Sequence, residues 1–256
     1  MSASLRLRTV CLTHPGKVRS ANEDSHFANE DAGVWIVADG MGGHDDGQLA
    51  SSIVTETTRQ TPLTGRFEED VDSLAGALRQ ANAEIQATAA AHHKRMGSTV
   101  VALYLADRRF ACLWAGDSRI YLLRDGALHQ LTRDHTQVQE MVDRGLLSAA
   151  EAKHHPMSHV LSRAVGVQET LELDAISDEA AARDVFLLCS DGLTGLVPDD
   201  EIAGTLSSLS VNAACNRLLE MVLDRGAPDN VTIVAVSCEE KTALVLPAAS
   251  DGEGWS

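Results

Sequence analysis

The stretch STVVALYLADRRFACLWAGDSRIYLLRDGALHQLT, residues 98–132, carries the strongest signal for the fold. It holds four apolar runs of strand length in succession, and Asp125 and Gly126 separate the last two. An Asp-Gly pair between two such runs is typical of a two-residue hairpin turn. Consecutive strands joined by short turns pair antiparallel, so this stretch predicts the centre of an antiparallel sheet.

The segments on either side come in blocks of strand and blocks of helix. Apolar or alternating runs predict strands at 5–13, 34–38, 171–177, 184–190 and 230–238. Apolar residues at helical spacing predict helices at 46–60, 68–93, 136–153, 199–207 and 211–225. Strands and helices do not alternate, as a doubly wound parallel sheet requires. The order therefore predicts an α+β fold with antiparallel sheets and segregated helix pairs.

Composition narrows the class of protein. The 256 residues are 44% hydrophobic, which is ordinary for one large globular domain or two small ones. The 37 acidic and 21 basic residues give a formal net charge of −16. This balance argues against a general nucleic-acid-binding protein, which needs a basic face to neutralise phosphates.

Cysteine usage and the N-terminus indicate a compartment. The five cysteines are widely spaced and none forms a C-x-x-C pair, so the sequence predicts no zinc ribbon and no thioredoxin-type site. Cys112, Cys189 and Cys238 lie inside apolar runs, which favours buried thiols in a reducing cytoplasmic compartment. We expect neither a signal peptide nor a membrane span, because no apolar window is suitable for either.

Aspartates stand at the ends of four predicted strands. Asp39 follows VWIVA, Asp117 follows FACLWAG, Asp191 follows DVFLLCS and Asp229 precedes NVTIVAVSC. Carboxylates that meet at one edge of the sheets repel one another unless a cation neutralises them. Oxygen ligands favour Mg²⁺ or Mn²⁺ over zinc. The alternative interpretation is that each Asp-Gly pair simply marks a turn.

Several segments, taken in order, match the motifs of one family: GKVRSANEDS (16–25), VADGMGGH (37–44), MGSTVVAL (96–103), AGDSRIYLLRDG (115–126), LTRDHT (131–136), CSDGLTGLV (189–197) and PDNVTIVAV (228–236). This ordered set resembles the metal-dependent protein phosphatase family, protein phosphatase 2C, in its compact bacterial form. The resemblance implies an α/β/β/α sandwich of two antiparallel sheets flanked by helix pairs. It also implies one catalytic domain over residues 1–240, with a flap at about 136–166, and a flexible tail at 241–256.

The resemblance further implies a site for two Mn²⁺ or Mg²⁺ ions at one edge of the sandwich. Asp39 would bridge both ions, and the Gly40 carbonyl would bind one of them. Asp191 and Asp229 would hold the other ion. Asp39 and Asp24 are the catalytic residues that the resemblance implies.

The roles of the remaining site residues are also implied by the resemblance. Glu23 and Asp24 would act largely through metal-bound waters. Arg19 would bind the substrate phosphate, which suits a planar guanidinium that can hold two oxygens at once. Asp117, together with Asp191, matches the acids that hold a third, weaker metal ion in bacterial members.

The implied activity is hydrolysis of phosphoserine and phosphothreonine in proteins. A water that bridges the metals would attack the phosphorus in line, without a phosphoenzyme intermediate. Some relatives carry a histidine general acid directly after the Asp-Gly pair, and this chain has Met41 there. The proton donor to the leaving group therefore stays open, with a metal-bound water as the preferred candidate.

The implied partners are phosphorylated proteins and a bacterial Ser/Thr kinase of the eukaryotic type, whose substrates include proteins with forkhead-associated domains. The expected protein is a cytoplasmic monomer that binds neither nucleic acid nor membrane. The alternatives are a phosphoprotein-binding pseudophosphatase, a small-molecule phosphatase and a phosphatase of anti-anti-sigma factors. The first is disfavoured because Asp39, Asp191 and Asp229 are all present.

Several residues also have plain structural interpretations. Arg19 can be a surface cation, Glu23 and Asp24 can cap a turn, and Asp117 can close a hairpin. The predicted role of Asn230 is to cap or orient Asp229, and the remaining residues are predicted to be packing residues (Ser98, Thr99) and solvated flap histidines rather than zinc ligands (His154, His155, His159).

Overall fold

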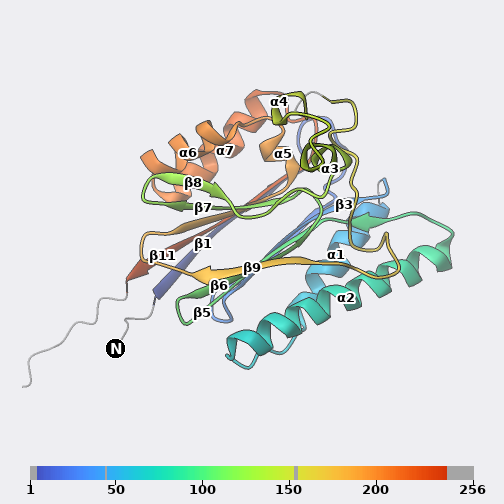
Figure 1. The fold of residues 1–256 in the computed structure, drawn as a ribbon, viewed down its shortest axis with the longest axis horizontal. Helices are drawn as coiled ribbons and strands as arrows, with labels where there is room; N and C mark the ends of the chain where they lie inside the picture. Colours follow the sequence, from blue (N-terminus) through green and yellow to red (C-terminus); the bar gives the residue numbers. More distant parts are fainter. Residues whose placement is uncertain (1–4, 44, 153–154, 241–256) are drawn as a thin grey trace, which may run out of the picture.

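The computed structural model describes residues 5–43, 45–152 and 155–240, so the tail predicted at 241–256 lies outside the described residues. Two antiparallel sheets pack face to face, and helices cover the outer face of each sheet (Figure 1). The predicted α+β fold, with two antiparallel sheets between helical layers, is confirmed. Among the described helices, none is both long and apolar enough to cross a membrane.

The first sheet joins strands from both ends of the described chain. In spatial order they are β1 (Leu5–His14), β11 (Val231–Glu240), β10 (Val185–Cys189), β7 (Arg119–Arg124) and β8 (Ala127–Gln130). The predicted Asp-Gly turn joins β7 to β8, with φ of 50° at Asp125 and 80° at Gly126. Positive φ at both turn positions matches the right-handed twist of the two strands.

The second sheet carries the strand that leads into the acidic motif. In spatial order its strands are β2 (Asp24–Asn29), β3 (Val34–Met41), β5 (Val100–Ala106), β6 (Arg109–Ala115) and β9 (Asp174–Glu179). A short strand, β4 (Gly97–Ser98), pairs with the end of β3. That pairing brings Gly97 opposite Met41 and Ser98 opposite Gly40.

The helices form the two outer layers. The second sheet is covered by α1 (Asp45–Arg59) and α2 (Phe67–His92), and the first by α5 (Asp191–Thr194), α6 (Asp199–Ser208) and α7 (Val211–Asp224) (Figure 1). Two short helices, α3 (Gln137–Asp143) and α4 (Ala149–Ala152), lie between β8 and β9, in the segment predicted to be a flap and called the flap below.

Strand β3 shows how the sequence builds these layers. Val34, Ile36 and Ala38 pack in the core beneath α1 and α2, whereas Trp35 and Val37 pack between the two sheets. Successive side chains of a strand point to opposite faces, so Asp39 continues the inter-sheet face. The carboxylate of Asp39 therefore lies at the end of the gap between the sheets.

Three sequence predictions differ from the structure. No strand was expected at β2, an edge strand whose DSHFAN sequence has no apolar run. The helix predicted at 136–153 is two helices, because Gly145 takes φ of 69° after α3 and Ser148 makes a reciprocal cap with Glu151 at the start of α4. The strand predicted at 171–177 lies at 174–179, where it pairs with β6.

Candidate active site

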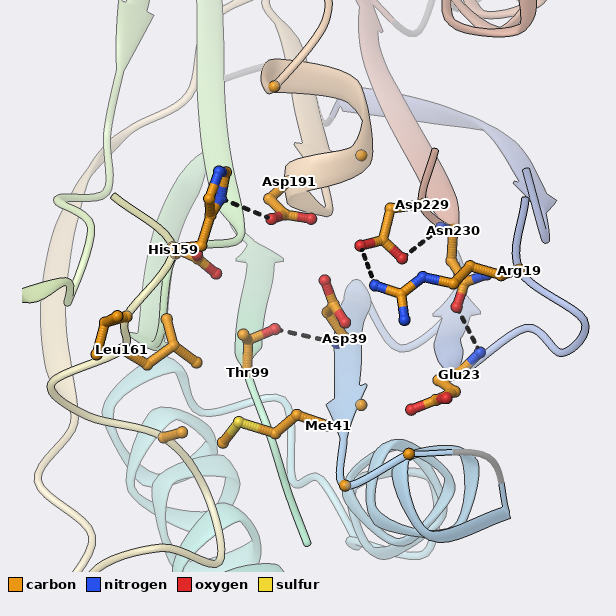
Figure 2. Close-up of a pocket in the computed structure, with 18 of the residues that line it drawn as sticks. Arg19, Glu23, Asp39, Met41, Thr99, His159, Leu161, Asp191, Asp229 and Asn230 are labelled. Atoms are coloured by element: carbon orange, nitrogen blue, oxygen red, sulfur yellow. Dashed lines mark hydrogen bonds and ion pairs between the residues drawn. The ribbon is translucent and has the colours of Figure 1, made fainter. Parts of the chain in front are cut away.

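A pocket of about 940 Å³ opens at one end of the sandwich (Figure 2). It gathers segments that are far apart in the chain: the loop before β2, the end of β3, the β6–β7 loop, the start of α5 and the residues before β11. Seven of the predicted site residues line it: Arg19, Glu23, Asp39, Gly40, Asp117, Asp191 and Asp229. Asp24 does not line the pocket.

Asp39 is held through its backbone at the pocket floor. Its N–H donates to Thr99 Oγ1 at 3.0 Å, and its carbonyl accepts from Ser98 Oγ at 3.1 Å and from the Thr99 N–H at 2.8 Å. Thr99 Oγ1 also lies 2.7 Å from Ser118 Oγ, next to Asp117. Ser98 and Thr99 are buried, as predicted for packing residues, and their hydroxyls also tie together β3 and the β6–β7 loop, which carry Asp39 and Asp117.

Asp24 lies beneath the pocket, between the sheets. It stands directly opposite Asp39 in the β2–β3 pairing and is 8% exposed. Its Oδ2 accepts hydrogen bonds from Ser190 Oγ at 2.8 Å, directly after β10, and from Thr232 Oγ1 of β11 at 2.7 Å. Its Oδ1 is buried without a hydrogen-bond partner. Sequence reasoning missed Ser190 and Thr232, although each lies next to a predicted acidic motif.

The aspartates raise one another's pKa values. Burial raises the pKa of Asp39 well above its ordinary value, and the carboxylates of Asp24 and Asp191 add to the effect. Burial also raises the pKa of Asp24 to about 6 and that of Asp117 to about 8, and Asp191 contributes to both. The pKa of Asp191 is raised by burial and by Asp229. Such a group of acids favours a bound cation, which would stabilise their ionised forms.

Arg19 reaches into the pocket from the loop before β2. Its Nη2 donates to Asp229 Oδ2 at 2.7 Å, and this hydrogen bond raises the pKa of the guanidinium. About half of the Arg19 side chain is exposed, and its guanidinium points toward Asp229 (Figure 2). A guanidinium at this position can bind a phosphate group, and it also balances the negative charge of Asp229.

Asn230 holds the loop that carries Arg19 and Glu23. Its Oδ1 accepts from the Glu23 N–H at 2.7 Å, and its Nδ2 donates to the carbonyls of Pro15 and Ala21, each at 2.9 Å. Its backbone N–H donates to Asp229 Oδ1 at 2.8 Å. The predicted link to Asp229 thus runs through the backbone, whereas the side chain fixes the loop.

Two glycines permit the close backbone contacts of the site. A Cβ on Gly40 would collide with the carbonyl oxygen of Gly47 at the start of α1, and a Cβ on Gly192 would collide with the carbonyl oxygen of Asn230. The glycine after each acid therefore lets a neighbouring segment approach the strand end.

The residues of the pocket fit a hard divalent cation. The unpartnered Oδ1 of Asp24 supports this fit, because a buried carboxylate oxygen without a partner is unfavourable unless a positive charge balances it. Within residues 5–43, 45–152 and 155–240, no three His, Cys, Asp or Glu side chains are already grouped as metal ligands.

The flap places one histidine at the pocket. The side chain of His159 is 79% exposed, and its Nδ1 lies 3.9 Å from Asp191 Oδ2 (Figure 2). It is solvated, as predicted, but it also lines the pocket. His155 accepts from the Met157 N–H. His154, like His44 of the VADGMGGH motif, lies outside the described residues.

The sequence of this chain is similar to those of known proteins. The model of the family described as protein phosphatase 2C matches residues 16–232. The chain belongs to the protein phosphatase 2C family. The resemblance predicted from the ordered motifs is confirmed.

Named members of the protein phosphatase 2C family are similar along most of the chain. It is 37% identical to the serine/threonine protein phosphatase PstP of Mycobacterium tuberculosis, over 98% of this chain and 49% of that protein. The chain thus spans about half the length of PstP. It is 35% identical to the serine/threonine phosphatase stp of Listeria welshimeri, over 88% of this chain and 93% of that protein.

Solved structures of the family share the sandwich. PppA, a key regulatory component of T6SS in Pseudomonas aeruginosa, has a TM-score of 0.86 and 40% identity, over 92% of this chain and 99% of that one. The catalytic domain of PstP in complex with two manganese ions has a TM-score of 0.83 and 36% identity, over 93% and 100% of the two chains.

Proposed function

We propose that this protein is a phosphoserine/phosphothreonine protein phosphatase that depends on Mn²⁺ or Mg²⁺. The observation that carries the proposal is the convergence of Asp39, Asp191 and Asp229 with the Arg19 guanidinium in one pocket. The relatives named as serine/threonine phosphatases, and the PstP structure with two manganese ions, support it.

We infer the roles of the acids from the family resemblance, and their places in the site support these roles. Asp39, at the pocket floor, would bridge two ions, and the Gly40 carbonyl would bind one of them. Asp191 and Asp229, from the other sheet, would hold the second ion. Asp24, buried beneath Asp39, would act through a water molecule that donates a hydrogen bond to its unpartnered Oδ1.

The remaining polar residues surround this centre. Glu23 lies against Gly47 of α1 and would act through water on the same ion as Gly40. Asp117 and Asp191 would hold a third, weaker ion. Arg19 would turn from Asp229 to the substrate phosphate, where it would hold two oxygens and orient the ester for in-line attack.

The reaction is hydrolysis of a phosphate monoester. A bond forms between a water oxygen and phosphorus, the bond from phosphorus to the Ser or Thr oxygen breaks, and a proton passes to that oxygen. Bound divalent ions would lower the pKa of water and stabilise the charge on the phosphoryl group. Because Met41 cannot donate a proton, water in the pocket would supply it, and no phosphoenzyme forms.

The test is hydrolysis of a phosphothreonine peptide by the purified protein with Mn²⁺, with Mg²⁺ and with excess EDTA. The proposal predicts turnover with a divalent ion and none with EDTA. Turnover that survives EDTA would contradict the metal roles. Phosphopeptide binding without turnover would indicate a pseudophosphatase, and hydrolysis of small aryl phosphates alone would indicate a small-molecule phosphatase.

We also infer a regulatory setting. A Ser/Thr kinase of the eukaryotic type would supply the phosphorylated substrates, with forkhead-associated-domain proteins among them. Similarity to PppA, a key regulatory component of T6SS, supports a regulatory role for this chain as well. The five free cysteines favour a reducing compartment such as the cytoplasm, where the protein would act as a monomer.

A further inference from the structure

Apolar side chains cover one side of the candidate active-site pocket. Met41 from the end of β3 reaches toward Leu161 of the flap, on the opposite side of the pocket from Arg19 (Figure 2). Val160 and Val167 also line the pocket, and they are 39% and 55% exposed. Single exposed valines are ordinary on protein surfaces, but these adjoin a site for a charged substrate.

Met41 and Val167 both lie against Gly97. A Cβ placed on Gly97 would lie 2.8 Å from Met41 Cε and 3.0 Å from Val167 Cγ2. The missing side chain of Gly97 therefore leaves room for both methyl groups beside the backbone of β4. Met41, Leu161 and Val167 all line the pocket, and we call these three side chains the apolar subsite.

Backbone pairing fixes the apolar subsite relative to the acids. Met41 lies opposite Gly97 in the β3–β4 pairing. The flap also pairs with β4. The N–H of Ser98 donates to the carbonyl of Val165 at 2.9 Å, and the N–H of Val165 donates to the carbonyl of Ser98 at 2.8 Å. The subsite thus belongs to the same hydrogen-bonded framework as Asp39.

The spacing along β3 matches that of an extended peptide. Asp39 and Met41 are two residues apart, so both side chains face the pocket, about 6.6 Å apart along the strand. In an extended substrate, the side chains of residues i and i+2 also share one face at this spacing. A peptide whose phosphoryl group lies over Asp39 would place a second side chain near Met41.

We propose that Met41, Leu161 and Val167 form a subsite for an aliphatic side chain two residues from the phosphorylated Ser or Thr. The inference rests on the proposed phosphatase function and names the peptide class that it prefers. An aliphatic side chain would remove water from Met41 and Val167, whereas a charged or amide side chain would lose its hydration without gaining a partner.

The test uses phosphothreonine peptides that differ at one position. Leu, Asn or Glu is placed in turn at the −2, −1, +1 and +2 positions, and kcat/KM is measured with Mn²⁺. We expect Leu to exceed Asn by about tenfold at −2 or +2, depending on the direction of the bound chain, and by much less at −1 and +1. Equal kcat/KM for all peptides, or a preference only at −1 or +1, would overturn the subsite.

Variants locate the preference on the molecule. Val167→Asn and Met41→Gln are each expected to reduce the Leu-to-Asn ratio of kcat/KM to about 2 or less. Comparing two peptides on the same variant removes any general loss of activity. Leu209→Asn, at an exposed leucine at the end of α6, is the matched control and is expected to keep the wild-type ratio.

The failures of the two proposals are distinguishable. If Val167→Asn and Met41→Gln both keep the wild-type ratio, the subsite assignment is wrong while the phosphatase function stands. If no peptide is hydrolysed with any divalent ion, the proposed function fails, and the subsite fails with it.

Discussion

Asp24 and Asp39 face each other across β2 and β3, and this pair illustrates how single residues define the site. Asp39 lines the pocket, whereas Asp24 is buried and accepts hydrogen bonds from Ser190, at the end of β10, and from Thr232 of β11. One acid would therefore contact a cation, and the other links the two sheets directly below it. Neighbouring carboxylates in such different settings are expected to respond differently to substitution.

Asp39→Asn is expected to lower kcat more than about a hundredfold, because it removes the charge that would bridge two cations. The measurement is turnover of a phosphothreonine peptide with Mn²⁺, with circular dichroism to confirm that the variant folds. Asp72→Asn, at an exposed position on α2, is the control and should keep wild-type turnover. Normal turnover in Asp39→Asn would contradict the proposed role of Asp39 in metal binding.

Arg19→Ala is expected to raise KM about tenfold with a smaller change in kcat, because the guanidinium would hold the phosphate in both the ground state and the transition state. Steady-state kinetics with a phosphothreonine peptide measure the split. Arg19→Lys should be intermediate, since an ammonium cannot bind two oxygens in one plane. An unchanged KM in Arg19→Ala would place Arg19 outside the substrate site.

At the scale of elements, the start of α2 is fixed by a buried carboxylate far from the pocket. Asp70 is fully buried and accepts hydrogen bonds from the N–H groups of Thr64 and Gly65 and from Tyr104 Oη at 2.6 Å. Burial raises the pKa of Asp70, but these hydrogen bonds outweigh it and hold the pKa below its ordinary value. The carboxylate thus joins α2 to β5 in its charged form.

Asp70→Asn is expected to lower the free energy of unfolding by about 1–3 kcal/mol at neutral pH, because an amide cannot accept all of these bonds. A lowered folded-state pKa contributes stability above the unfolded pKa of about 3.9, and that stability is lost as the pH falls through the folded value. The difference from wild type should therefore shrink below about pH 4. Urea unfolding at several pH values measures it; a pH-independent difference would refute the linkage.

Glycines in different elements should respond in opposite directions to the same change. Gly192→Ala is expected to destabilise by more than about 2 kcal/mol, because the new Cβ meets the carbonyl oxygen of Asn230. Gly76→Ala, within α2 where a Cβ meets open space, should stabilise by up to about 1 kcal/mol. Thermal unfolding of both variants is the measurement, and equal stability of the two would contradict the packing at α5.

At the scale of the whole molecule, the site depends on two sheets that meet at one end. Asp39 comes from the second sheet, whereas Asp191 and Asp229 adjoin strands of the first. A cation bound by all three would link the sheets, so metal binding and folding stability should be coupled.

Mn²⁺ at about 100 times its Kd is expected to stabilise the protein by about 2.7 kcal/mol, or about 5–10 °C in Tm. The comparison is thermal unfolding in MnCl2 and in NaCl of equal ionic strength with EDTA. Asp39→Asn should lose most of the increment. An equal Tm in both solutions would show that no cation joins the sheets.

The limits of sequence prediction lie in the contacts between segments. The hairpins and the long helices were predictable, because each depends on local periodicity and turn residues. Strand β2 was not, since an edge strand with polar residues has no such pattern. The roles of Thr99, Ser190 and Thr232 depend on acids at least 60 residues away, namely Asp39 for Thr99 and Asp24 for the other two.

By itself, the sequence determined the fold class, the family and the identity of the acids at the strand ends. These properties depend on local apolar patterns and on the order of short motifs. Only the tertiary structure decided that Asp24 lies beneath the pocket, that Asn230 fixes the loop of Arg19, and that Met41 and Val167 both lie against Gly97. Such relations depend on how two sheets and a flap pack together, and no local pattern in the chain encodes that geometry.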